Sequence, residues 1–85
     1  MELEQLRTFL TVAEAKSFTR AAEKLFVSHS TVSRAVSALE EELGVRLLER
    51  DNRVFGLTEA GERLCERSKQ LLELAEDIEN ELRNI

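Results

Sequence analysis

Two helices separated by only three residues are predicted between Ser17 and Gly44, and this short connection constrains the fold more than any other feature. Ser17 and Ser28 stand where helix N-caps are expected, and Gly44 stands where the second helix should end. Apolar residues recur in the second helix at i, i+4, i+7 and i+11 and make one inward stripe: Val32, Val36, Leu39 and Leu43. Helices joined so closely must cross near their ends, which is the helix-turn-helix arrangement.

The opposite side of the second helix is small, hydroxylated and cationic. Roughly 180° from the stripe, at about 100° per residue, the helix presents Ser30, Arg34 and Ser37, with Ser33 beside them. No acidic residue occurs from Lys24 to Leu39. The acidic run that follows, residues 40–42, is expected to be a solvated helix end, away from any DNA. A helix that enters the DNA major groove needs short donors and a guanidinium, and carboxylates must stay away from phosphate. We therefore expect a recognition helix over about residues 29–42.

Three further elements complete the predicted head, residues 1–57. Apolar residues share one face of a helix over residues 3–16, namely Leu3, Leu6, Phe9, Leu10 and Ala13. The short helix after Ser17 turns Ala21, Ala22 and Leu25 inward. Residues 46–50 and 53–57 are two strand-capable runs around the turn pair Asp51-Asn52, and they predict a hairpin. The expected fold class is mainly α: a winged helix-turn-helix with a three-helix head and a small β-hairpin wing.

A long C-terminal helix is predicted for residues 58–85, with Thr58 as its N-cap and Gly61 as its one weak point. Large apolar residues recur every seven positions, at Leu57, Leu64, Leu71, Ile78 and Ile85. Mostly smaller residues fill the intervening heptad positions, at Gly61, Ser68, Ala75 and Leu82. So small a head cannot cover such a helix, and the seam therefore needs a partner helix. We expect homodimerisation, with parallel and antiparallel pairing both open, through Leu64, Ser68, Leu71, Ala75, Ile78, Leu82 and Ile85.

Charge and composition exclude several classes of protein. The net charge of −5 is unusual for a DNA-binding protein, but residues 58–85 hold eight acidic and only four basic residues. Local phosphate contact therefore remains open, with weak non-specific binding. Cys65 has no partner for a disulfide or a zinc site, so no metal or cofactor is expected. One His, one Cys and no glycine-rich loop disfavour an enzyme. Without a signal peptide or a membrane-length apolar run, we expect a cytoplasmic chain that no membrane binds.

Many residues at fixed offsets, with no gap, resemble the N-terminal DNA-binding domain of LysR-type transcriptional regulators. The residues that carry this resemblance include Ser17-Phe18, Ala21-Ala22, Val27-Ser28, Ser33-Arg34, Leu39-Glu40, Leu43-Gly44, Arg50, Arg53 and Leu57-Thr58-Glu59-Ala60-Gly61. The resemblance implies sequence-specific binding of double-stranded DNA at an inverted-repeat operator, by a homodimer with antiparallel linker helices. It also implies a wing against flanking DNA, tetramers among full-length members, and a separate ligand-sensing domain. This chain is then an excised domain that takes no small-molecule ligand.

The predicted DNA-contacting residues lie in the two central helices and the hairpin. They are Thr19, Ser28, His29, Ser30, Thr31, Ser33, Arg34, Ser37, Arg50 and Arg53. Arg34 is assigned to guanine or phosphate, whereas the hydroxyls of Ser28, Thr31 and Ser33 could instead cap the helix. Arg50 and Arg53 could be ordinary hairpin charges, of which Arg53 is the better candidate.

Two residues depart from the family's pattern. His29 stands where the family more often has Gln, so amide recognition of adenine does not transfer, and the ring either reaches DNA or is merely exposed. Leu48 stands where an aromatic residue is more usual, which concerns core packing. The alternative function is an acidic helical dimer that binds another protein and no DNA. The acid-free face disfavours it, because helices that bind proteins present larger apolar or aromatic anchors.

Overall fold

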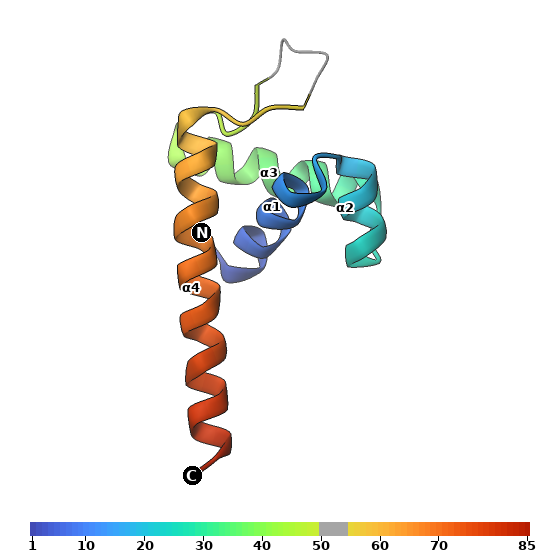
Figure 1. The fold of residues 1–85 in the computed structure, drawn as a ribbon. Helices are drawn as coiled ribbons and strands as arrows, with labels where there is room; N and C mark the ends of the chain where they lie inside the picture. Colours follow the sequence, from blue (N-terminus) through green and yellow to red (C-terminus); the bar gives the residue numbers. More distant parts are fainter. Residues whose placement is uncertain (50–54) are drawn as a thin grey trace.

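Four helices and the base of a hairpin make up the chain in a computed structural model, which describes residues 1–49 and 55–85. The helices are α1 (Leu3–Ala15), α2 (Phe18–Leu25), α3 (His29–Leu43) and α4 (Glu59–Arg83). The first three form a head beside the N-terminal half of α4, and the C-terminal half of α4 extends beyond the head (Figure 1). The molecule measures 50 × 26 × 20 Å, and the predicted mainly α class is confirmed.

Side-chain caps begin three of the helices as predicted. The hydroxyls of Ser17, Ser28 and Thr58 each accept a hydrogen bond from the backbone N–H three residues ahead, at 3.0–3.2 Å. Such a bond satisfies one of the N–H groups that a helix leaves unpaired at its start. The polar residues therefore fix where α2, α3 and α4 begin.

Left-handed residues end the first three helices. Gly44 has φ +69° after α3, as expected, and Phe26 has φ +57° after α2. The first helix ends one residue before the predicted boundary, because Lys16 takes φ +54° and its N–H donates to the carbonyl of Val12. This ending leaves Ser17 free to start α2.

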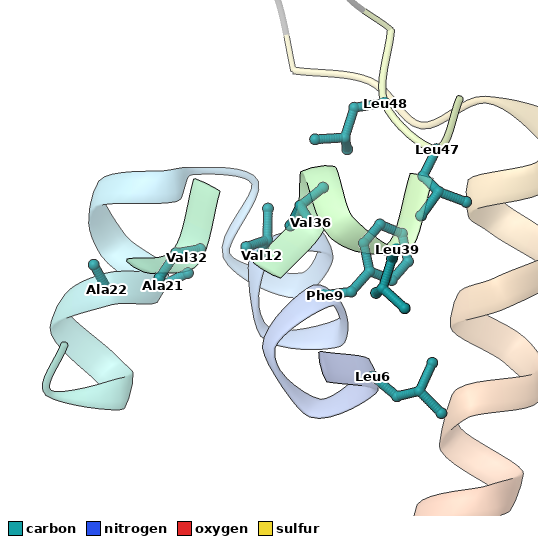
Figure 2. Close-up of a cluster of buried hydrophobic side chains, with 10 residues drawn as sticks. All are labelled: Leu6, Phe9, Val12, Ala21, Ala22, Val32, Val36, Leu39, Leu47 and Leu48. Carbon is teal, nitrogen blue, oxygen red and sulfur yellow. The ribbon is translucent and has the colours of Figure 1, made fainter. Parts of the chain in front are cut away.

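The core lies where the three helices of the head meet the hairpin base, and Figure 2 shows its ten buried hydrophobic side chains. They are Leu6, Phe9, Val12, Ala21, Ala22, Val32, Val36, Leu39, Leu47 and Leu48. The predicted face of α1 was partly wrong: Val12 is buried, whereas Leu3 is exposed. The α3 stripe is confirmed except for Leu43 in the last turn, which is 40% exposed.

The hairpin is anchored at its base. Leu48 and Leu57 form an antiparallel bridge, and the N–H of Glu49 donates to the carbonyl of Gly56 at 2.9 Å. Within the described residues, the two predicted strands are reduced to this bridged pair. The predicted turn Asp51-Asn52 lies outside the described residues.

The N-terminal half of α4 packs against its own head. Gly61 and Ser68 are buried, and Leu64 is half-buried against the core. A Cβ atom on Gly61 would lie 2.1 Å from the carbonyl oxygen of Leu47, so no larger residue fits there. Ser68 was predicted to lie in the dimer seam. The structure corrects this assignment, because Ser68 is 1% exposed and out of a partner's reach. The small residues allow α4 to approach the head closely.

A different face of α4 stays uncovered. We call it the free stripe, and its residues follow a 3-4-4-3 spacing: Leu71, Leu74, Ile78, Leu82 and Ile85. All five are exposed, and the heptad pattern had missed Leu74 because it lies outside the two repeating positions. Ala75 beside the stripe is half-buried. None of the helices in the described ranges has the length and apolar character needed to cross a membrane.

Ser68→Ala should raise the free energy of unfolding by about 1 kcal/mol. Within the described residues, the Ser68 hydroxyl is buried without a hydrogen-bond partner, which costs stability, and alanine is the better helix former. Urea unfolding followed by circular dichroism at fixed protein concentration measures the change. The exposed Ser37→Ala serves as the control and should stay within about 0.5 kcal/mol. A loss of stability in Ser68→Ala would mean that the hydroxyl is satisfied.

Candidate nucleic-acid interface

The first turn of α3 is organised by the hydroxyl of Ser28. Its Oγ accepts from the N–H of Thr31 and lies 2.8 Å from Thr31 Oγ1 and 3.1 Å from Ser30 Oγ. Ser28 and Thr31 are thus engaged in capping, the alternative that the sequence had left open. All three residues are exposed, so the positive end of the α3 dipole faces solvent. An exposed helix N-terminus of this kind is suited to an anion such as phosphate.

The outer face of α3 is accessible along its length. Ser30, Arg34 and Ser37 are exposed and Ser33 is half-buried, as the periodicity predicted. Among the described residues, no carboxylate forms an ion pair with Arg34. The guanidinium is therefore available to a carbonyl, a base edge or a phosphate of another molecule.

The N-terminus of α2 lies beside that of α3. The rings of Phe18 and His29 are 5.6 Å apart between centroids and tilted by 42°. Thr19, the next residue of α2, is exposed, as are the cations Arg20 and Lys24. Two helix N-termini therefore lie close together, and the exposed Arg20 stands in the first turn of one of them, a combination suited to the phosphate backbone of DNA.

The structure brings together the predicted site residues of α2 and α3, whereas Arg50 and Arg53 lie outside the described residues. In the described ranges, no group of three potential ligands could hold a metal ion. Burial raises the pKa of the Cys65 thiol, against the lowering effect of Lys69. A thiol with a raised pKa is a weak nucleophile, and Cys65 packs against the core instead.

Two residues that matter at this surface were missed from the sequence. Glu40 was expected to be solvated, but its carboxylate accepts hydrogen bonds from the N–H groups of Leu47, at 2.8 Å, and Leu48, at 3.4 Å. The sequence did offer a signal: Glu40 stands one turn before Gly44, which ends the helix, so its side chain can reach the chain that follows. Phe26, in the turn between α2 and α3, is 95% exposed, which no local pattern indicated.

Comparisons with known proteins find bacterial transcription regulators and their DNA-binding domains. The family model described as "Bacterial regulatory helix-turn-helix protein, lysR family" matches residues 3–62. The regulator IlvY of Escherichia coli (strain K12) is 50% identical over 72 residues, which are 85% of this chain and 24% of IlvY. The chain spans between 23% and 59% of the length of three other curated relatives.

Solved structures match the whole fold. The BenM DBD in complex with catB site 1 DNA is 38% identical with a TM-score of 0.94, over 99% of this chain and 94% of that chain. The CbnR DBD–DNA complex is 43% identical with a TM-score of 0.92, over 99% of this chain and 97% of that chain. The capped α3, its exposed face of hydroxyls and Arg34, and the long α4 thus accompany the sequence match, and the chain belongs to the lysR family of bacterial regulatory helix-turn-helix proteins.

Proposed function

We propose that this chain is the DNA-binding domain of a cytoplasmic transcription regulator and binds specific double-stranded sequences with α3 in the major groove. The observation that carries the proposal is the exposed α3 face, where small hydroxyls surround an Arg34 with no acidic partner among the described residues. Relatives named as transcriptional regulators, and similar domains solved with DNA, support it.

Electrophoretic shift assays on a duplex selected from a random library test this function directly. Affinity should fall as salt rises, because cations that bind phosphate release counterions from DNA. The net charge of −5 keeps binding to random duplexes weak. Selection that enriches no sequence, or affinity that ignores salt, would count against DNA docking through α3.

A homodimer through the free stripe belongs to the same proposal. Five exposed apolar side chains in one row need a cover, and a second α4 supplies the matching row. The family resemblance implies antiparallel pairing of the two α4 helices, in which the stripe of one helix lies against the reversed stripe of the other. Two α3 helices would then read an inverted repeat with half-sites about 34–36 Å apart, or a multiple of this distance.

Arg34→Ala should weaken binding to the selected duplex by about 10- to 100-fold and binding to random duplex much less. A bidentate contact from arginine to guanine is worth about 1–3 kcal/mol of discrimination. Fluorescence anisotropy on the two duplexes measures both losses. Arg7→Ala is the matched control, since Arg7 lies on α1 and pairs with Glu4. Equal losses on both duplexes would reassign Arg34 to the phosphate backbone.

A protein-interaction module that binds no DNA remains the second candidate, and one observation favours it. Phe26 is 95% exposed beside the first turn of α3, and exposed aromatic side chains are common anchors in protein interfaces. The shift assay separates the candidates, because this module would retard no duplex at any salt concentration.

A further inference from the structure

Glu40 accepts four hydrogen bonds from backbone N–H groups of the chain that leaves α3. Its main-chain carbonyl accepts from the N–H of Gly44 at 2.9 Å and of Val45 at 3.3 Å. Its carboxylate Oε2 accepts from the N–H of Leu47 at 2.8 Å and of Leu48 at 3.4 Å. A single residue of the recognition helix therefore controls both the end of that helix and the start of the hairpin.

The first residue before α4 holds the same segment from its other side. The hydroxyl of Thr58 donates to the carbonyl of Arg46 at 2.6 Å, and its N–H donates to the carbonyl of Leu47 at 3.0 Å. Thr58 also caps α4 through the N–H of Gly61. The N–H groups of Leu47 and Leu48 are thus bonded to α3, and the carbonyls of Arg46 and Leu47 are bonded to Thr58 at the start of α4.

We propose that Glu40 is a positioning residue for DNA binding: its carboxylate fixes the direction in which the hairpin leaves the recognition helix. The inference rests on the proposed function, with α3 in the major groove, and on the contact between the hairpin wing and flanking DNA that the family resemblance implies. Without the carboxylate, Leu47 and Leu48 lose these hydrogen bonds to α3, whereas the bonds to Thr58 and the apolar packing of both leucines in the core remain. The hairpin base is then held less tightly in register with the helix that reads the groove.

A carboxylate suits this position for a physical reason. One anionic oxygen accepts two N–H donors: the bond from Leu47, at 2.8 Å, has the length of a charge-assisted bond, and the one from Leu48, at 3.4 Å, is longer and weaker. The neighbouring acids do not hold the hairpin in this way, because Glu41 is exposed and the carboxylate of Glu42 pairs with the N-terminus. Glu41 therefore provides a control of the same charge, one residue along the same helix.

The test compares two lengths of one duplex selected by the wild-type chain: the full selected site, and a form trimmed of the flanking pairs. Glu40→Ala should bind the full duplex about tenfold more weakly, the size of a lost hydrogen bond to a charged group, and should bind the trimmed duplex like the wild type. We call the increase in affinity from the trimmed to the full duplex the flank gain. Glu40→Gln keeps an oxygen acceptor and should recover most of the flank gain. Glu41→Ala should match the wild type on both duplexes.

Hydrogen exchange measured by NMR supplies a second test that needs no DNA. In Glu40→Ala, the N–H of Leu47 should exchange at least about tenfold faster, while that of Gly44, bonded to the main-chain carbonyl, stays protected. An unchanged flank gain in Glu40→Ala, or an equal loss in Glu41→Ala, would overturn the proposal. Should Glu40→Ala fail to fold, Glu40→Met takes its place, because it keeps the length of the side chain without a strong acceptor, and an unchanged flank gain in that variant would overturn the proposal. A wild-type chain that selects no duplex refutes the proposed function, while Leu47 exchange still tests the role of Glu40.

Discussion

Gly61→Ala should destabilise the domain by at least about 3 kcal/mol, near the upper end of what overpacking a buried site costs. For a domain of this size, that loss lowers the midpoint of thermal unfolding by roughly 12–24 °C. The cause is steric: the added Cβ would lie 2.1 Å from the carbonyl oxygen and 3.1 Å from the carbonyl carbon of Leu47. Both are backbone atoms of the segment that Thr58 and Glu40 hold, so the neighbour cannot simply rotate away.

Helix propensity alone predicts the opposite sign for this substitution. Gly61 lies in the first turn of α4, and in a helix interior glycine is about 1 kcal/mol less favourable than alanine. The steric cost is several times larger than this gain, so packing decides the outcome. Thermal unfolding followed by circular dichroism, at one protein concentration, measures the net effect.

Gly44→Ala is the informative comparison, because the two glycines are needed for different reasons. Gly44 has φ +69° and no atom near its missing Cβ, so alanine there meets backbone strain of about 1–2 kcal/mol without a clash. We expect Gly61→Ala to lose clearly more stability than Gly44→Ala. A Gly61→Ala protein as stable as the wild type would mean that α4 can move away from the hairpin base at little cost.

The features predicted correctly from the sequence are those that depend on near neighbours along the chain. The caps at Ser17, Ser28 and Thr58 act over three residues, and the inward and outward faces of α3 repeat every three or four. Such patterns are visible without a partner. The exposed positions of Ser30 and Arg34 follow from the same periodicity.

The features that the sequence did not reveal depend on contacts between parts of the chain that are distant in sequence, or between one chain and another. In α4, a heptad repeat looks the same whether the head of the same chain or another helix covers it, and the head takes Gly61 and Ser68. The stripe left for a partner is therefore rotated to include Leu74. Glu40 escaped for a similar reason, since its side-chain partners lie seven and eight residues away, beyond the end of the helix.

Ile78→Glu should convert the proposed dimer into monomers, raising the dimer dissociation constant by at least about 100-fold. Each subunit would lose the burial of an isoleucine, about 1.5–3 kcal/mol, and would bring a carboxylate into the seam. Ile78 is 52% exposed within one chain, so the head itself should keep its stability. Sedimentation velocity measures the dissociation, and circular dichroism checks that α4 remains helical.

DNA binding should change with the loss of the dimer, because two linked half-site contacts gain about 10²–10⁴ in affinity over one. Ile78→Glu should therefore lose the preference for an inverted repeat over a single half-site, while binding the half-site like the wild type. Asn80→Glu is the matched control: it adds the same charge to an exposed position two residues on, about 200° around the helix. Leu74→Glu should act like Ile78→Glu, because both side chains belong to the free stripe. A dimer that survives both substitutions, or dissociates equally with Asn80→Glu, would place the subunit contact on another face.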